Sequence, residues 1–207
     1  DDHYFKYVAD FGRLGPDKGQ GGKFLILPPG YEGEVPEGYF TSQANTFGHW
    51  VIWRGFQKEG SPLPAVEATK SLFKMYPLSQ KDNPPAMNFV NVSGKEFNTI
   101  HKMDERIYEE INAVVQSEPS SAENAEVLGS LAAIGIVKGQ SFTPDARMKE
   151  LLKEGANIGS AIVRTQMAKP RNEYLYKFPG TQWLNPLAYK SYTFEHDGAR
   201  LLDARSA

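Results

Sequence analysis

The spacing of apolar residues changes near residue 60, and this change limits the fold more than any other feature of the chain. Before residue 60, short runs of aromatic and β-branched residues alternate with clusters of Gly, Pro and Asp, which is typical of strands joined by turns. The runs are YFKYVADFG, GKFLILPP, GYFTSQANT and HWVIWRGF. We predict that they form four strands of an antiparallel meander, in a sandwich-like or barrel-like sheet.

After residue 60, the apolar residues recur at the spacing of helices with one apolar face. The helix starts also carry signals. Ser120 and Glu123 have the spacing of a capping box, and Thr143 precedes a proline at a first helical position. We predict four helices, over residues 64–75, 99–116, 120–135 and 143–168.

Two glycines, Gly155 and Gly159, fall inside the last predicted helix. Each costs about 1 kcal/mol relative to alanine in a helix interior, so another interaction should compensate. We expect a neighbouring helix to approach the bare backbone there.

Beyond residue 170 the sequence again becomes aromatic and strand-like, in NEYLYKFPG and YKSYTFEH. The predicted fold class is therefore α+β, with about four helices and a returning strand region at the C-terminal end. We expect a β meander over residues 1–60, a helical cluster packed on it over 61–170, and a strand and loop region over 171–207.

Composition excludes several classes of protein. A formal net charge of −2 and a pI of about 6.1 leave no basic surplus for nucleic acid. No apolar run approaches the roughly 18 residues that a membrane span needs, so we expect none. The absence of cysteine excludes disulfides and cysteine-ligated zinc, but leaves the cellular compartment open.

One flank of the predicted helix over residues 99–116 carries His101, Asp104 and Tyr108, three or four residues apart. In the structural interpretation, Asp104 anchors a loop or an arginine while the other two fill space. In the functional interpretation, His101 and Asp104 form a proton-transfer or metal pair, and these three residues are the candidate catalytic group. Two ligands are too few for a typical catalytic metal, so we predict neither a metal site nor a cofactor.

A second group lies in the predicted strand GHWVIWRGF. Alternation places His49 and Trp53 on one face, where an aromatic surface could hold a sugar or another apolar ring. Strand tryptophans are more often part of the core. Arg54 lies on the opposite, mostly apolar face and needs an anionic partner, for which Asp104 is a candidate. We take His49, Trp53 and Arg54 as the candidate ligand-binding residues.

Long blocks of the chain resemble a known family. The blocks include GPDKGQGGKFLILPPGYEGEVPEGYF, VIWRGF, YPLSQKDNPPAMNFVNVSGKEFNTIHKMD, GIVKGQSFTPDARMKELL and DGARLLDARSA. They are similar to the central part of proteins that carry the domain of unknown function 1254, followed by the partner domain 1214. The family motif is matched at Asn98, Thr99, Ile100, His101, Asp104, Tyr108 and Glu109, whereas Glu105 and Arg106 depart from it.

The resemblance implies that the chain is a fragment of a longer protein. Such proteins often begin with a signal peptide and end in a jelly-roll-like sandwich, which implies a periplasmic or secreted location. The expected partners of the chain are then the missing N-terminal and C-terminal segments. Without them, exposed edge strands should drive self-association, so a homo-oligomer is also expected.

The resemblance brings no established activity, and two hypotheses remain. The first is a binding or structural module with a glycan or small organic ligand at the junction of sheet and helices. The alternative is a hydrolase-like enzyme that uses His101 and Asp104 as an acid/base or metal pair. The second hypothesis requires a cleft in which these groups converge, with a shifted pKa.

Overall fold

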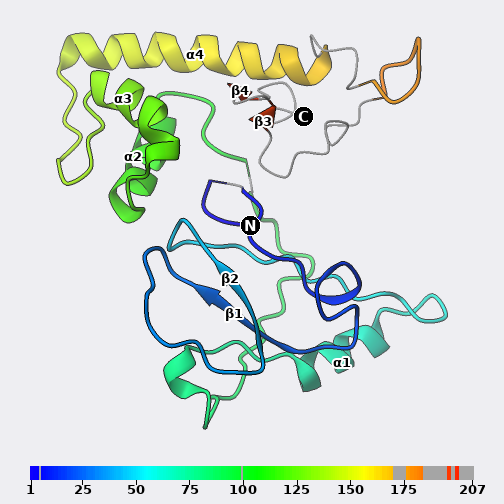
Figure 1. Ribbon diagram of the computed structural model, residues 1–207. Helices are drawn as coiled ribbons and strands as arrows, with labels where there is room; N and C mark the ends of the chain where they lie inside the picture. Colours follow the sequence, from blue (N-terminus) through cyan, green and yellow to red (C-terminus); the bar gives the residue numbers. More distant parts are fainter. Residues whose placement is uncertain (5, 99, 170–175, 184–194, 197–198, 201–207) are drawn as a thin grey trace. The chain divides into compact units, whose positions relative to one another are not determined.

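The computed structural model describes residues 1–4, 6–98, 100–169, 176–183, 195–196 and 199–200 (Figure 1). The chain divides into two compact units. Unit 1 consists of Asp1–Trp50 and Ile100–Ala207, and unit 2 consists of Val51–Thr99. These units cut across the three regions expected from the sequence, whose boundaries stay predictions.

Unit 1 contains a two-stranded sheet of β1 (Lys23–Leu27) and β2 (Tyr39–Gln43) (Figure 1). The strands run parallel, with Phe24 opposite Phe40, so the predicted antiparallel meander is wrong for this pair. A tight hairpin turn would have made them antiparallel, but residues 28–38 form a long connection rich in Pro and Gly that brings the chain back to the same end.

The other two predicted strands are not formed in the described residues. The segment YFKYVADFG contains no strand, and HWVIWRGF contributes a single antiparallel bridge between His49 and Asp2. The ring of Phe11 nevertheless packs on Phe24, with ring centroids 4.6 Å apart. The aromatic residues of this region therefore contact the sheet without extending it.

In the part of the chain that the structure describes, four α-helices accompany the sheet, which confirms the α+β class. They are α1 (Leu63–Leu72), α2 (Ile107–Ser117), α3 (Ala125–Ala133) and α4 (Ala146–Ala168). Short 3₁₀ helices cover Gly12–Leu14, Leu78–Gln80 and Ala122–Asn124. Helix α1 belongs to unit 2, and the other three α-helices belong to unit 1.

Helix α2 begins eight residues later than the predicted start at residue 99, so that start is wrong. The reason is local. Oδ1 of Asp104 accepts a hydrogen bond from the backbone N–H of Arg106 at 3.0 Å, which forms a turn that competes with helical bonding. His101 and Asp104 therefore precede the helix, and only Tyr108 of the three candidate catalytic residues lies on it.

The C-terminal ends of α3 and α4 follow the predicted signals, whereas their N-terminal caps do not. Gly135, with φ of +91°, ends the turn after α3, where its N–H donates to the carbonyl of Ala132 at 3.0 Å. Helix α4 is capped by Asp145, which accepts from the N–H of Met148 at 2.8 Å, and not by Thr143. Its end at Ala168 is as predicted. The capping box at Ser120 is not formed, because α3 is preceded by a 3₁₀ turn.

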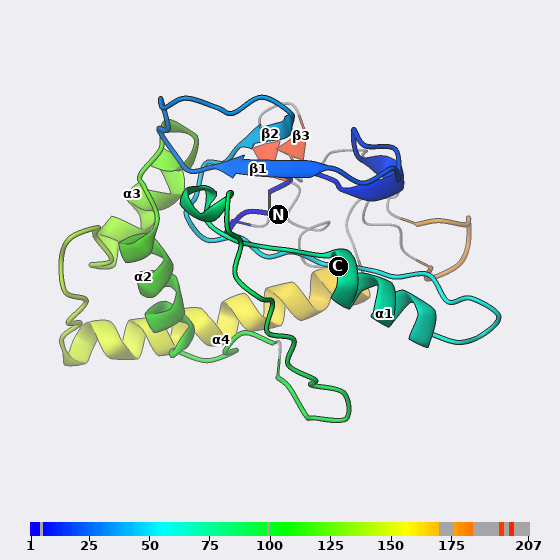
Figure 2. The same cartoon turned by 90° about the horizontal axis from the view of Figure 1, so that it is seen from below.

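The expected close approach to α4 occurs at one of its two glycines. A Cβ atom at Gly155 would lie 3.0 Å from the hydroxyl oxygen of Tyr108 on α2, whereas Gly159 faces open space. In Figures 1 and 2, α2 and α3 both lie near the N-terminal half of α4. A side chain, and not a helix backbone, therefore uses the space that Gly155 leaves.

All the buried apolar residues among those described lie in unit 1: Ala44, Val115, Ile136, Leu152 and Ala156. At the C-terminal end, β3 (Glu195–His196) pairs antiparallel with β4 (Ala199–Arg200). Most of the predicted strand segments NEYLYKFPG and YKSYTFEH lies outside the described residues.

Candidate functional site

The most strongly organised polar group of unit 1 is the carboxylate of Glu118. Glu118 follows α2 directly and has extended backbone angles, φ −98° and ψ 152°, as expected of a residue before proline. Its side chain is only 1% exposed. A buried carboxylate is costly unless hydrogen bonds and a partner charge offset its desolvation, so its contacts define the site.

Three donors from distant parts of the sequence reach this carboxylate. Oε1 lies 2.6 Å from Nδ1 of His3 and accepts the N–H of Gly48 at 2.9 Å, while Oε2 accepts the N–H of Phe47 at 2.6 Å. Burial raises the pKa of Glu118, but these hydrogen bonds outweigh it, and the net pKa lies below the ordinary value. The carboxylate is therefore ionised at neutral pH.

An ionised carboxylate only accepts hydrogen bonds, so it fixes the tautomer of His3. The proton of the neutral imidazole lies on Nδ1, and Nε2 carries the lone pair. The His3 side chain is 42% exposed. The imidazole of His3 is thus accessible to solvent, and its Nδ1 is oriented by the buried carboxylate of Glu118.

Further hydrogen bonds hold the segments that supply the donors. The fully buried Thr46 accepts from the N–H of His3 at 3.1 Å and donates to the carbonyl of Gly48 at 2.9 Å. The buried Asp2 accepts from the N–H groups of Tyr4 and Lys6, at 2.9 and 2.8 Å. Burial, with the charges of Glu118 and Asp2, raises the pKa of the Tyr4 phenol.

Gly48 has no room for a side chain. A Cβ atom there would lie 2.7 Å from Nδ1 of His3 and 2.9 Å from Oε1 of Glu118. The pairing of imidazole and carboxylate thus depends on glycine at this position.

Lys138 completes the site from the helical side. Its Nζ donates to the carbonyls of Val115, Gln116 and Glu118, at 3.3, 2.9 and 2.6 Å. A cation there satisfies the last carbonyls of α2 and interacts favourably with the negative end of the helix dipole. It also offsets the negative charge that Glu118 places at this unfavourable end.

The candidate catalytic residues have separate partners. Nδ1 of His101, in a side chain that is 82% exposed, lies 3.1 Å from Oε2 of Glu110. Asp104 binds Nε of Arg106 at 2.8 Å, and hydrogen bonds from the side chain and backbone of Arg106 lower the pKa of Asp104 to about 2. The arginine that Asp104 anchors is thus a near neighbour in sequence, and a joint role of His101 and Asp104 stays a prediction.

The candidate ligand-binding residues are divided between the two units. His49 is exposed in unit 1. In unit 2, Trp53 is 51% exposed, so it is not a core residue; its ring centroid lies 5.2 Å from that of Phe73 and its Nε1 donates to Thr69 at 3.2 Å. Arg54 is also exposed. Since the predicted strand is not formed here, the face assignments that grouped these residues no longer apply.

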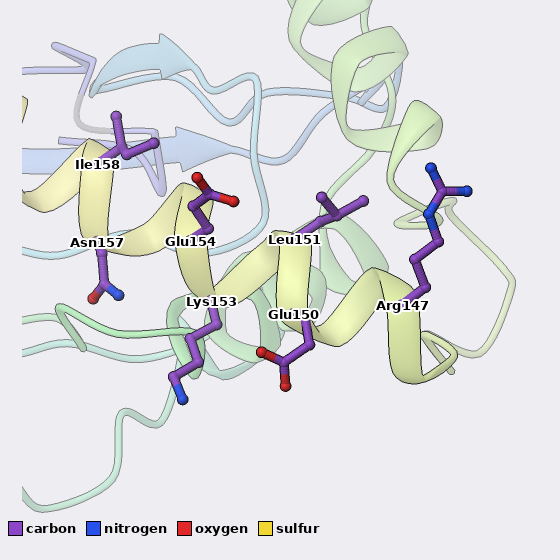
Figure 3. A pocket seen from close by; sticks show the side chains of 7 residues that line it. All are labelled: Arg147, Glu150, Leu151, Lys153, Glu154, Asn157 and Ile158. Atoms are coloured by element: carbon purple, nitrogen blue, oxygen red, sulfur yellow. The ribbon is translucent and has the colours of Figure 1, made fainter.

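Helix α4 carries a shallow hollow of about 550 Å³ on its surface (Figure 3). Arg147, Leu151, Glu154 and Ile158 project to one side of the helix, and all the residues that line the hollow belong to α4. Ligand sites in proteins usually enclose most of their ligand. A hollow lined by one helix lacks the facing wall for that.

In the described part of the chain, no group of three or more His, Asp or Glu residues is placed to hold a metal ion. Among the helices that the structure describes, none combines the length and apolar content of a membrane span.

Sequence reasoning missed both His3 and Glu118, which are 115 positions apart. One signal was available. Glu118 precedes Pro119 at the negative end of a predicted helix, where a carboxylate is unfavourable unless it has partners elsewhere. Nothing in the sequence identified His3 as that partner.

The comparisons with known proteins concern the part of the chain that contains His3, Phe47 and Gly48. Residues 1–77 match the family model described as Protein of unknown function (DUF1254). This match supports the DUF1254 family, in agreement with the resemblance found in the sequence. Glu118 lies outside the matched range, so the match covers only one half of the site. A search of the curated proteins finds no match to the chain.

Proposed function

We propose that the chain is a binding or structural module whose ligand, a glycan or small organic molecule, lies where the β1–β2 region meets the helices of unit 1. The observation that carries this proposal is the buried Glu118 carboxylate. It joins the loop after β2, through Phe47 and Gly48, to the end of α2. A junction fixed by such bonds offers a preorganised surface, which reduces the entropy cost of binding.

The aromatic side chain at this junction suggests the class of ligand. Phe47 is 60% exposed although its backbone N–H is bound to Glu118. The rigid backbone therefore presents an apolar ring to solvent, and flat aromatic faces pack well against sugar rings and apolar molecules. This placement supports the proposed ligand chemistry.

The test is a titration of the intact chain with soluble oligosaccharides and small aromatic compounds, followed by amide NMR. We expect shifts that centre on Phe47, Gly48 and the end of α2 and that Phe47→Ala removes. The matched variant Phe56→Ala removes a ring that is 76% exposed in unit 2. Shifts lost in Phe56→Ala but kept in Phe47→Ala would contradict the proposed location, and no shifts with any ligand would contradict the proposed function.

We also propose that the module works outside the cytoplasm, as part of a longer protein that contains the partner domain 1214 and a jelly-roll-like sandwich. The DUF1254 match over residues 1–77 supports the family part of this expectation. The test is fractionation of cells that express the complete gene product. Recovery in the periplasm or medium is expected, and retention in the cytoplasm would contradict the proposal.

Self-association through strand edges belongs to the same proposal. Among the described residues, β1 and β2 pair only with each other, which leaves one edge of each strand available. Analytical ultracentrifugation of the isolated chain should show association that is absent from the complete protein. A monomer at all concentrations would contradict it.

A further inference from the structure

Among the described residues, two pairs of histidine and glutamate are in contact, and they differ in burial. His101 and Glu110 are 3.1 Å apart, with side chains that are 82% and 38% exposed. His3 and Glu118 are 2.6 Å apart, and the Glu118 side chain is 1% exposed. The two pairs therefore contrast an ordinary surface contact with an imidazole held by a preorganised acid.

The negative charge of Glu118 is not needed for its hydrogen bonds to the backbone. The N–H groups of Phe47 and Gly48 could be satisfied by any neutral oxygen at the same place. An ionised carboxylate at 2.6 Å, however, also stabilises a positive charge on the imidazole of His3. Among the described residues no group binds Nε2 of His3, so that nitrogen can accept a proton from a bound molecule.

We propose that His3 and Glu118 form a proton-transfer site at which Nε2 of His3 acts as a general base in the hydrolysis of small esters. This activity is independent of the binding function proposed above. His3 would be the catalytic residue, because it exchanges the proton. Glu118 would be a positioning residue, because it acts through the imidazole.

In the proposed reaction, water gives a proton to Nε2 while its oxygen forms a bond to the acyl carbon of the ester. The bond between that carbon and the leaving oxygen then breaks, and the proton passes from Nε2 to the leaving oxygen. The products are a carboxylic acid and an alcohol, so atoms and electrons balance without a cofactor. Nδ1 keeps its proton throughout, and Glu118 stays ionised beside the transient imidazolium.

Other titratable groups lie near the site. Burial and then the charges of Glu118 and Asp2 raise the pKa of the Tyr4 phenol, and Lys6 pairs with Glu123 at 3.1 Å. On the helical side, the Lys138 ammonium binds the backbone carbonyl of Glu118. Any pH dependence of the reaction must be assigned by substitution at His3 itself.

The test measures hydrolysis of p-nitrophenyl acetate by the intact chain and its variants. His3→Gln should lower the rate about tenfold. A tenfold loss is smaller than the rate enhancement usual for a positioned general base. We expect the smaller effect because the N–H groups of Phe47 and Gly48 donate to Glu118 and are not free to stabilise an oxyanion. Added imidazole should restore activity to His3→Ala, and Glu123→Gln should leave the rate unchanged. Activity equal to wild type in His3→Gln, or a smaller loss there than in His101→Gln, overturns the proposal.

Glu118→Gln gives a second readout, with folding checked by circular dichroism. It should lower the rate and shift the pH profile, because the neutral amide stabilises the imidazolium less than the carboxylate does. If this variant unfolds, ¹⁵N NMR of the His3 ring in the wild type replaces it. The neutral form of the ring should carry its proton on Nδ1, and a neutral form with its proton on Nε2 overturns the proposal.

Discussion

Units 1 and 2 contain similar residue types but use them differently. Unit 1 buries apolar residues such as Ile136, 1% exposed, and a polar network around Glu118. In unit 2 none of the described residues is buried. Within unit 2, Trp53 packs against Phe73, and Gly55 lies against α1, where a Cβ at Gly55 would lie 2.7 Å from that of Ala65.

The difference shows that apolar content alone does not produce a core. Phe56, Leu72 and Phe97 of unit 2 are 76%, 80% and 81% exposed, so their transfer from water contributes little to folding. Unit 1 combines a small apolar core with hydrogen bonds between segments far apart in sequence. Its stability should therefore depend on a few specific polar contacts.

Removal of the Glu118 carboxylate should have the largest effect on the difference in packing between units 1 and 2. Glu118→Ala should lower the free energy of unfolding by about 3 kcal/mol, because hydrogen bonds to a charged group contribute about 1.5 to 3 kcal/mol each. It leaves the N–H groups of Phe47 and Gly48 without their acceptor. Urea denaturation followed by circular dichroism measures the change.

The control is Glu110→Ala, which removes the acid of the exposed pair with His101. That substitution should change stability by less than about 1 kcal/mol, as is typical of surface ion pairs. Equal effects of the two substitutions would show that burial of Glu118 does not contribute to stability.

Amide hydrogen exchange compares the two units directly in the wild-type chain. The amides of α1 should exchange about 100-fold faster than those of the central turns of α4, because opening α1 exposes no buried side chain. Helix α4 must expose Leu152 and Ala156 to open. Similar protection of α1 and α4 would mean that unit 2 is stabilised by contacts beyond those described within it.

Local signals predicted the helices better than they predicted the sheet or the site. The Pro and Gly signals around α1, α3 and α4 act within a few residues, and these helices lie close to their expected ranges. The predicted start of α2 is wrong because the turn at Asp104 and Arg106 competes with the helix. The periodicity of apolar residues does not report such a turn. The direction of β2 depends on the path of residues 28–38, and the pairing of His3 with Glu118 depends on a contact between residues 115 positions apart. Local sequence signals report neither.

Gly48 tests how tightly the site in unit 1 is packed. Gly48→Ala should cost about 2 kcal/mol, as for overpacking, because its Cβ would lie within 3.0 Å of both His3 and Glu118. The control Gly129→Ala, inside α3 with open space around it, should raise stability by up to about 1 kcal/mol. Thermal melts measure both. A destabilised Gly129→Ala with an unchanged Gly48→Ala would contradict the packing described here.

Acid should weaken unit 1 through Glu118. Its pKa is lower in the folded chain than the ordinary 4.5, so its contribution is fully present above that value and is lost as pH falls through the folded pKa. The carboxyl of Asp104, whose pKa in the folded chain is about 2, also titrates in acid, so the measurement is made in an Asp104→Asn variant. In that background, unfolding free energies should fall below pH 4.5, and Glu118→Gln should flatten the fall. An unchanged slope in Glu118→Gln would assign acid sensitivity to other groups.

The smallest expected effect concerns the cation at the end of α2. Lys138→Met keeps an unbranched side chain but removes the ammonium group that binds three carbonyls, and it should cost about 1 kcal/mol. Lys153→Met, on the exposed surface of α4, is the matched control and should have almost no effect. Because the charge acts on the helix that carries Glu118, Lys138→Met should also reduce the additional cost of Glu118→Ala in the double variant. Strictly additive costs would show that Lys138 and Glu118 stabilise unit 1 independently.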